Sequence, residues 1–282
     1  MTSISHGRIT ADGMIDFAPL PKGDALGEAV VAAIDAAAAA RNAAQPPRTY
    51  LGGSMLGWPC DRQLGFYWRR LPKDPGREVD GRLARLFATG HHIEPLVAGW
   101  FRDAGYDLVT HDDNGAQFGW SIDGGKIRGH IDGAFLTGPV GRFPCLWENK
   151  GLKADKWTKL VANGLRAERW EYFVQCQVYM AQMQLDEHPA MFTALNKDTS
   201  ELYVEFVRFD PEVAAEAIGR GQKIVRSSRP QQLDRVAKDP SDWRCKWCDW
   251  RERCWADKTM PKARTAMPAW LARAPGVASV AT

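Results

Sequence analysis

Apolar side chains recur with helical or strand periodicity along most of the chain after Tyr50. Spacings of three and four predict one long amphipathic helix over residues 83–104. Further helices are predicted at residues 62–70, 165–185 and 211–226. Short apolar or alternating runs predict strands at 106–111, 116–122, 126–135, 143–149, 191–195 and 202–209. The order of helix, strands, helix, strands and helix predicts an α/β fold with a small mixed sheet flanked by helices.

The two ends of the chain differ from this middle part. Residues 29–44 are almost all alanine, which favours a helix but leaves little side chain to pack, and Gln45-Pro46-Pro47 ends that helix. Residues 259–282 are rich in alanine and proline. We therefore expect an N-terminal tail or peripheral helix over 1–48, the main domain over 49–258, and a C-terminal tail over 259–282.

Composition is that of an ordinary globular protein, with 45% hydrophobic and 25% charged residues and a net charge of +3. So small a net charge gives no general attraction to nucleic acid, but seven of the ten charged residues between Arg62 and Arg85 are basic. Neither a signal peptide nor a membrane-spanning apolar run is visible, so we expect a cytoplasmic protein without a membrane partner. In that compartment cysteines are metal ligands or small buried residues more often than disulfides.

Three carboxylates occupy positions that suit a divalent metal. Asp132 and Glu148 fall near the ends of two predicted strands, and Glu94 lies on the predicted helix over 83–104. Adjacent strands would bring Asp132 and Glu148 together, and the backbone carbonyl of Asn149 could add a third oxygen, which suits Mg²⁺ or Mn²⁺. Lys150 lies two residues after Glu148, so the two side chains point to the same side of a strand. An ammonium group there can orient a water molecule or stabilise charge on a phosphate.

The predicted helix that follows carries a polar and aromatic set. Tyr172, Gln175 and Tyr179 are separated by three and four residues, which places them on one helix face. Gln175 could hydrogen-bond a water molecule or a phosphate, and Tyr179 could contact a backbone phosphate. Each feature alone is more often structural, but together with the three carboxylates they predict a site.

The cysteines form a second constellation. The spacing Cys245-x2-Cys248-x5-Cys254 predicts metal ligation, which requires a fourth ligand. Cys60, in a loop before the predicted helix at 62–70, is the preferred candidate, because Cys145 and Cys176 are predicted to be small buried residues. Such a site would tie the two ends of the domain together. By spacing alone, four thiolates also satisfy a tetrahedral zinc ion.

These motifs, in this order, resemble the PD-(D/E)-x-K nuclease superfamily. The matching elements are Gly-x-x-x-Glu, Gly-His-x-Asp, Glu-x-Lys and Gln-x-x-x-Tyr, at Glu94, Asp132, Glu148 with Lys150, and Gln175 with Tyr179. The last motif, and one cysteine before and three after the core, resemble the RecB-like branch with an iron–sulfur cluster. That branch includes CRISPR-associated exonucleases, AddB-type helicase-nucleases and phage-encoded forms. Ile131 replaces the proline of the superfamily name, and Glu94 stands where many RecB-like members carry histidine.

The resemblance implies a restriction-endonuclease-like core and a definite set of cofactors. Implied catalytic residues are Glu94, Asp132, Glu148, Lys150, Gln175 and Tyr179. A 4Fe–4S cluster on Cys60, Cys245, Cys248 and Cys254 is implied, with zinc as the alternative. The implied function is a Mg²⁺- or Mn²⁺-dependent DNA nuclease, an exonuclease on single strands or DNA ends that works with recombination or repair proteins. The alternative is a catalytically silent nuclease fold that binds DNA. We also expect the cluster to hold Arg62, Arg69 and Arg70 where they grip DNA phosphates.

Overall fold

The computed structural model describes residues 8–9, 15–16 and 24–256, so the expected C-terminal tail at 259–282 lies outside the described residues. The chain divides into two compact units, residues 1–46 with 79–87, and residues 47–78 with 88–282. The second unit therefore contains every residue of the predicted site. Within the described ranges, no helix combines the length and the apolar character that crossing a lipid bilayer requires.

The first unit is built around helix α1 (Ala25–Ala43), which begins four residues before the predicted alanine run. Its N-cap is Asp24, whose carboxylate accepts hydrogen bonds from the backbone N–H groups of Leu26 and Gly27. α1 buries none of its residues, as expected for a helix made largely of alanine. Arg85 pairs with Asp35 of α1 at 2.7 Å. Strands β1 (Arg8–Ile9) and β2 (Ile15–Asp16) pair with each other in antiparallel fashion.

Two sheets form the framework of the second unit. The larger has the order β10-β9-β8-β7-β4 and the smaller the order β3-β6-β5. All pairings are antiparallel except those of β8 with β9 and β3 with β6. The strands are β3 (Leu51–Gly52), β4 (Asp107–Val109), β5 (Gly119–Ile122), β6 (Ile127–His130), β7 (Gly133–Thr137), β8 (Cys145–Leu152), β9 (Ala190–Asn196) and β10 (Leu202–Val207).

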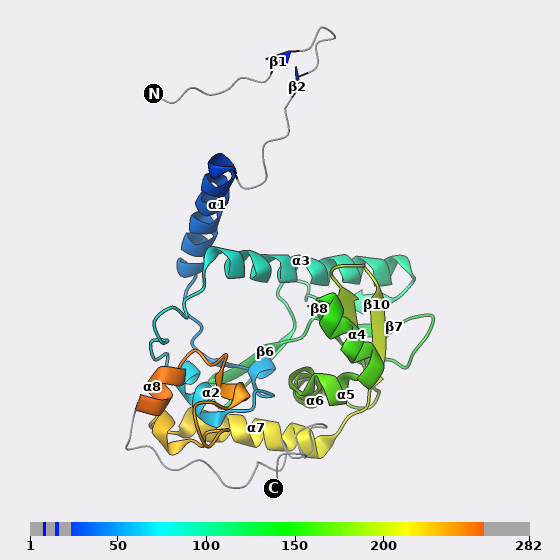
Figure 1. The fold of residues 1–282 in the computed structure, drawn as a ribbon. Helices are drawn as coiled ribbons and strands as arrows, with labels where there is room; N and C mark the ends of the chain where they lie inside the picture. The colour runs from blue at the N-terminus through cyan, green and yellow to red at the C-terminus, as the bar shows by residue number, and fades with distance from the viewer. Residues whose placement is uncertain (1–7, 10–14, 17–23, 257–282) are drawn as a thin grey trace. The chain divides into compact units, whose positions relative to one another are not determined.

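Helices cover both faces of the larger sheet (Figure 1). On one face, Phe101 of α3 packs edge-on against Phe135 of β7 and Trp147 of β8. On the other, Tyr172 of α6 stacks on Phe192 of β9, and α7 lies beside α6. The helices are α2 (Asp61–Trp68), α3 (Gly81–Asp103), α4 (Ala154–Asn163), α5 (Leu165–Glu168), α6 (Trp170–Met183), α7 (Pro211–Arg226) and α8 (Arg251–Ala256).

The predicted α/β class, with small mixed sheets flanked by helices, is confirmed. Several elements differ from the prediction, among them the following three. The single strand expected over 126–135 is broken at Ile131 and Asp132, so that β6 and β7 belong to different sheets. The helix expected over 165–185 is interrupted at Arg169, whose φ of −138° and ψ of 65° are not helical. Helix α4 was not predicted; it follows Lys153, and its N-terminal Ala154 N–H donates to the Asp198 carboxylate.

A buried ion pair joins helices α2 and α7. Arg220 donates from Nε to Asp61 Oδ1 at 2.5 Å and from Nη1 to the Leu56 carbonyl at 2.7 Å. The side chains of Arg220 and Asp61 are only 6% and 7% exposed. Because a buried charge without its counter-ion is very unfavourable, each of these residues depends on the other.

We predict that Asp61→Asn lowers the free energy of unfolding by about 3–5 kcal/mol, because it leaves Arg220 charged and buried. The double variant Asp61→Leu with Arg220→Met is expected to be more stable than Asp61→Asn, because both charges are removed together. Urea unfolding followed by circular dichroism measures both. A double variant less stable than the single one would show that the charges themselves are not the cause.

Candidate active site on strand β8

Asp132 lies at the break between the two sheets. The chain leaves the smaller sheet after His130 and enters the larger one at Gly133, which pairs with Trp147 of β8. This path brings the Asp132 carboxylate to the middle of β8, where Oδ2 accepts a hydrogen bond of 2.7 Å from the Asn149 N–H. The sequence predicted that Asp132 and Glu148 would meet at strand ends. They do lie together, but at a crossover between sheets and in the middle of a longer strand.

Strand β8 divides its side chains between the two faces of the sheet. Glu148 and Lys150 point to the side of α6, as their spacing of two residues predicts. Glu148 Oε1 accepts from Lys150 Nζ and, at 2.6 Å, from Gln175 Nε2 of α6. The Glu148 side chain has no solvent exposure, and that of Lys150 is 22% exposed. A fully buried carboxylate is thus held by a partly exposed cation and an amide.

Glu94 of α3 completes the acidic group. It is half-buried, and its pKa rises to about 7 because burial disfavours the charged form and Asp132 repels it. Burial and the charges of Asp132 and Glu94 likewise raise the pKa of Glu148 to about 8, although Lys150 opposes the rise. Burial also raises the pKa of Asp132. One ammonium cannot neutralise three carboxylates, so the fully ionised group would carry a net charge of −2 in a buried place.

Lys150 stays protonated in this setting. Burial alone would lower its pKa, but Glu148 and Asp132 outweigh that effect and raise it. The ring of Tyr172 lies beneath the ammonium, with 5.3 Å between Nζ and the ring centre. These contacts fix the ammonium beside the carboxylates, and its partial exposure leaves it open to a bound anion.

Tyr179 lies deeper in the core than its predicted role requires. Its ring is 3% exposed and packs edge-on against Trp120, with 5.8 Å between the ring centres. Burial and the charge of Glu148 raise the pKa of its hydroxyl, and Arg48 opposes that rise. A Cβ on Gly53 would lie 2.5 Å from Trp120 and 2.7 Å from Tyr179, so only glycine allows the backbone this close to both rings. Tyr179 is therefore a packed core residue that lies close enough to Glu148 for that charge to raise the pKa of its hydroxyl.

The other face of β8 carries a polar relay that the sequence did not point to. Trp147 Nε1 donates to Thr193 Oγ1 at 3.0 Å, and Thr193 Oγ1 donates to Asn149 Oδ1 at 2.8 Å. This relay holds the Asn149 side chain on the face away from Glu148 and leaves its N–H for Asp132. A threonine within the apolar run of residues 190–195 was the only signal for it.

The acidic group fits a hard divalent cation by its chemistry. Its donors are carboxylate oxygens, and Glu148 Oε2 is buried without a hydrogen-bond partner. As the side chains stand, no three His, Cys, Asp or Glu residues of the described chain are arranged to hold a single metal ion. A bound cation would nevertheless offset the excess negative charge of the three carboxylates and would give Glu148 Oε2 a partner.

The four predicted cysteine ligands line one cavity. Cys60 immediately precedes α2, Cys245 and Cys248 lie before α8, and Cys254 lies on α8. All four are free thiols. Burial raises the pKa of Cys248 to about 12, and the charges of the other three thiols add to the rise. Cys145 and Cys176 are buried in other parts of the core, as predicted.

Positive side chains surround this cysteine cavity. Arg235, Arg244 and Arg251 line the cavity. Arg62 lies close enough to interact electrostatically with Cys254 and Cys60. Thiolate ligands bring negative charge into a buried place, and nearby guanidinium groups would offset it. The cavity therefore fits a negatively charged thiolate centre.

The structure corrects the expectation for Arg62, whereas Arg69 and Arg70 are exposed. Arg62 is fully buried, and its guanidinium donates to the carbonyls of Leu233 at 2.8 Å and Gln231 at 3.2 Å. Arg69 donates to the Ser227 carbonyl. These two arginines tie α2 to the segment after α7, and Arg62 cannot reach a DNA phosphate. Arg70 is exposed and remains available.

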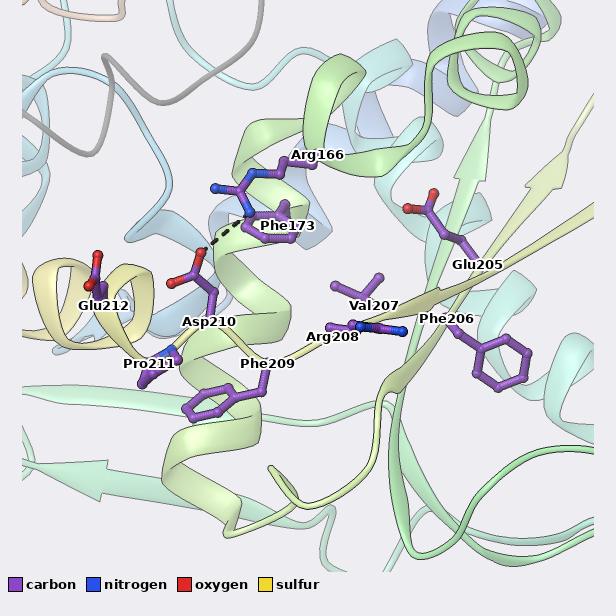
Figure 2. A pocket seen from close by; sticks show the side chains of 10 residues that line it. All are labelled: Arg166, Phe173, Glu205, Phe206, Val207, Arg208, Phe209, Asp210, Pro211 and Glu212. Atoms are coloured by element: carbon purple, nitrogen blue, oxygen red, sulfur yellow. Dashed lines mark hydrogen bonds and ion pairs between the residues drawn. The ribbon is translucent and has the colours of Figure 1, made fainter.

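An open pocket elsewhere carries no comparable chemistry. It lies where β10 leads into α7, and Figure 2 shows Arg166 over the ring of Phe173 with an ion pair to Asp210. The distance from Arg166 Nη1 to Asp210 Oδ2 is 3.3 Å. Asp210 also caps α7, and Glu205 accepts from the Leu165 N–H and the Tyr203 hydroxyl. Arg166, Asp210 and Glu205 in this pocket thus make contacts within the fold. The candidate active site remains the one on β8.

No protein family model matches the sequence, and no curated protein does. Among solved structures, SSO0001 is similar with a TM-score of 0.46 and 13% identity, over 82% of this chain and 98% of that one. An alkaline exonuclease, LHK-Exo, from Laribacter hongkongensis gives 0.43 and 14%, over 64% of this chain and 87% of that one. LHK-Exo in complex with dAMP gives 0.41 and 16%, over 63% and 86%. Likenesses this remote leave the function to be derived from the chemistry of the site.

Proposed function

We propose that this protein is a metal-dependent DNA nuclease that hydrolyses phosphodiester bonds at the site on β8. The observation that carries the proposal is the group of buried Glu148 with half-buried Glu94 and Asp132 around a single fixed ammonium, Lys150. Ionising all three carboxyls would leave a surplus of two negative charges, which is costly for stability at a largely buried site and is kept where function needs a cation. An exonuclease that acts on single strands or DNA ends fits the motif order given above.

The three carboxylates, with the backbone carbonyl of Asn149, would hold Mg²⁺ or Mn²⁺. Such a cation polarises a phosphate and lowers the pKa of a coordinated water molecule. Gln175 supports this role, because its hydrogen bond and that of Lys150 both go to Glu148 Oε1 and leave Oε2 for the cation. Asp132 is oriented by the Asn149 N–H.

Lys150 would act directly on the substrate. Its ammonium, held by Glu148 and the Tyr172 ring, can orient the attacking water and stabilise the charge that builds on the phosphate oxygens. The water oxygen bonds to phosphorus as the bond to the 3′ oxygen breaks, which leaves a 5′-phosphate and a 3′-hydroxyl. Tyr179 would keep the wall of the site rigid beneath the substrate.

We also propose that the cysteine cavity holds a 4Fe–4S cluster on Cys60, Cys245, Cys248 and Cys254. The four thiols share one cavity, as either a multi-iron cluster or tetrahedral zinc requires, and the resemblance of their spacing to the iron–sulfur branch favours the cluster. The surrounding arginines suit its negative charge. The role we propose for it is structural: it ties the start of α2 to α8 across almost the whole second unit.

We predict that Lys150→Ala lowers the rate of DNA cleavage by roughly 10²–10³-fold, as for the loss of a group that stabilises transition-state charge. The matched control is Lys156→Ala, which removes an exposed lysine on α4 that pairs with its neighbour Asp155. Digestion of end-labelled single- and double-stranded oligonucleotides with Mn²⁺ measures the rate. Wild-type protein that cleaves neither substrate would favour the silent DNA-binding alternative. Full activity in Lys150→Ala would refute the site assignment.

A second prediction concerns stability and pH. Because folding raises the pKa of Glu94 to about 7 and of Glu148 to about 8, the folded state binds these protons more tightly than the unfolded state. Their contribution to stability is complete below the ordinary carboxyl pKa and is lost as the pH rises through about 7 to 8. We expect the Tm of the metal-free protein to fall over this range, and Mn²⁺ to restore it by roughly 5–10 °C at saturating concentration.

Differential scanning fluorimetry with and without Mn²⁺, at about pH 6 and about pH 9, tests this linkage. Glu148→Gln should flatten the pH dependence and reduce the response to Mn²⁺. Glu187→Gln, at an exposed position between α6 and β9, is the control and should behave as wild type. A Tm that rises between the two pH values, or an equal response in all three proteins, would contradict the prediction.

A third prediction concerns the cysteine cavity. Protein purified without oxygen should be brown and contain about four irons per chain. Cys245→Ser should lose the colour and lower the Tm, whereas Cys145→Ser, at a buried cysteine outside the cavity, should keep the iron. Elemental analysis and visible absorption measure the outcome. Colourless protein with one zinc per chain would replace the iron–sulfur assignment by zinc.

A further inference from the structure

Two tryptophans in the segment that carries three of the cavity cysteines are exposed to solvent. Trp243 is 73% exposed and Trp247 is 75% exposed, more than any other large hydrophobic side chain of the described residues. Other tryptophans of the same segment are packed. Trp250 is 3% exposed, stacks on Phe66 and donates from Nε1 to the Leu71 carbonyl at 2.9 Å, and Trp255 lies under the guanidinium of Arg235. The exposure is therefore specific to Trp243 and Trp247.

The backbone that carries these two indoles is held in place. Trp243 begins a short 3₁₀ helix, Trp243–Cys245, which Asp242 caps by accepting from the Arg244 N–H at 2.9 Å. The Cys248 N–H donates to the Cys245 carbonyl at 3.1 Å. From the 69–77 segment, Arg77 donates to the Lys246 carbonyl at 3.3 Å. The exposed rings thus project from an ordered turn whose cysteines are the proposed cluster ligands.

Two cations lie between the two rings along the sequence, and one of them, Arg244, is paired with Asp242. The sequence reads Trp243-Arg244-Cys245-Lys246-Trp247, and the Lys246 ammonium lies 5.4 Å from the centre of the Trp247 ring. Neighbouring acids are largely neutralised: Asp242 pairs with Arg244 at 2.6 Å, and Asp249 pairs with Lys73 at 2.8 Å. Asp74 is buried and accepts from the backbone N–H groups of Glu252 and Arg253 at the start of α8.

We infer that Trp243 and Trp247 form a stacking platform for the bases of single-stranded DNA, with Lys246 contacting the phosphate between them. Aromatic rings interleaved with cations bind single strands in this way, because every base offers a flat face and every nucleotide a charge. A protein partner held by the hydrophobic effect would favour a continuous apolar patch, whereas these rings are separated by charged residues. The inference rests on the proposed nuclease function and specifies the form of its substrate: a strand whose bases are unpaired.

Binding measured without cleavage tests the platform. The full-length Lys150→Ala protein, without added divalent cation, is titrated into a fluorescein-labelled oligothymidylate of about 20 nucleotides, which exceeds the roughly 4–16 nucleotides that single-strand folds cover. Trp243→Ala and Trp247→Ala, added to this background, should each raise the Kd at least about fivefold, the loss typical of one base–aromatic stack. Trp100→Ala, which removes a 39% exposed tryptophan from α3, is the matched control and should leave the Kd unchanged.

Further comparisons separate stacking from charge. An abasic oligonucleotide of the same length keeps its phosphates and should bind the parent protein as weakly as thymidylate binds the tryptophan variants. Trp243→Phe and Trp247→Phe should retain most of the affinity, because an aromatic face remains. Lys246→Ala should reduce the slope of log Kd against log salt by about 0.7, the contribution of one contact to a single strand. Equal iron content and Tm in all variants ensure that the fold and the cluster are intact.

The possible outcomes separate this inference from the proposed function. If wild-type protein cleaves DNA, but the tryptophan variants bind thymidylate as the parent does, the platform is wrong and the nuclease assignment stands. Equal affinity for the abasic strand would also overturn the platform, because stacking would then contribute nothing. If the wild type neither cleaves nor binds any DNA, the proposed function itself fails.

Discussion

The constraint on which the site depends is the burial of the Glu148 carboxylate. A carboxylate with no solvent exposure needs partners, and Lys150 and Gln175 provide them at one oxygen only. With Asp132 and Glu94 nearby, the ionised group would hold three negative charges against one positive charge. A group selected for stability alone would be neutral or fully paired. This excess of negative charge is one reason why the pKa values of Glu148 and Glu94 are raised. The Oε2 atom of Glu148 is also left without a hydrogen-bond partner.

The rest of the second unit places that carboxylate. β8 is the central strand of the larger sheet and has helices against both faces, so alternate side chains serve two different layers. One layer receives Glu148 and Lys150 beside α6. The other receives Trp147 and Asn149, and the relay through Thr193 fixes their orientation. The change from one sheet to the other at Asp132 supplies the second acid from a separate direction, which the two faces of a single strand could not do.

The sequence predicted the features that follow from local periodicity. The spacing of two between Glu148 and Lys150 put them on one side of a strand, and the helical period turned Gln175 toward them. Long-range geometry was not accessible in the same way. No local pattern marks the break at Ile131 and Asp132, because both neighbouring segments have strand character and only the pairing of β6 and β7 with different sheets separates them.

Arg62 shows how composition can mislead where packing decides. It stands in a stretch rich in basic residues, which suggested contact with phosphate, yet it is buried and hydrogen-bonded to two carbonyls after α7. Tryptophan shows the opposite case: a residue of this type is usually largely buried, and Trp250 is, whereas Trp243 is exposed. Charge and aromaticity thus state which contacts a residue can make, and burial decides which of them it does make. Arg62 is buried and cannot bind DNA. Trp243 is held at the surface by an ordered turn and can contact a base.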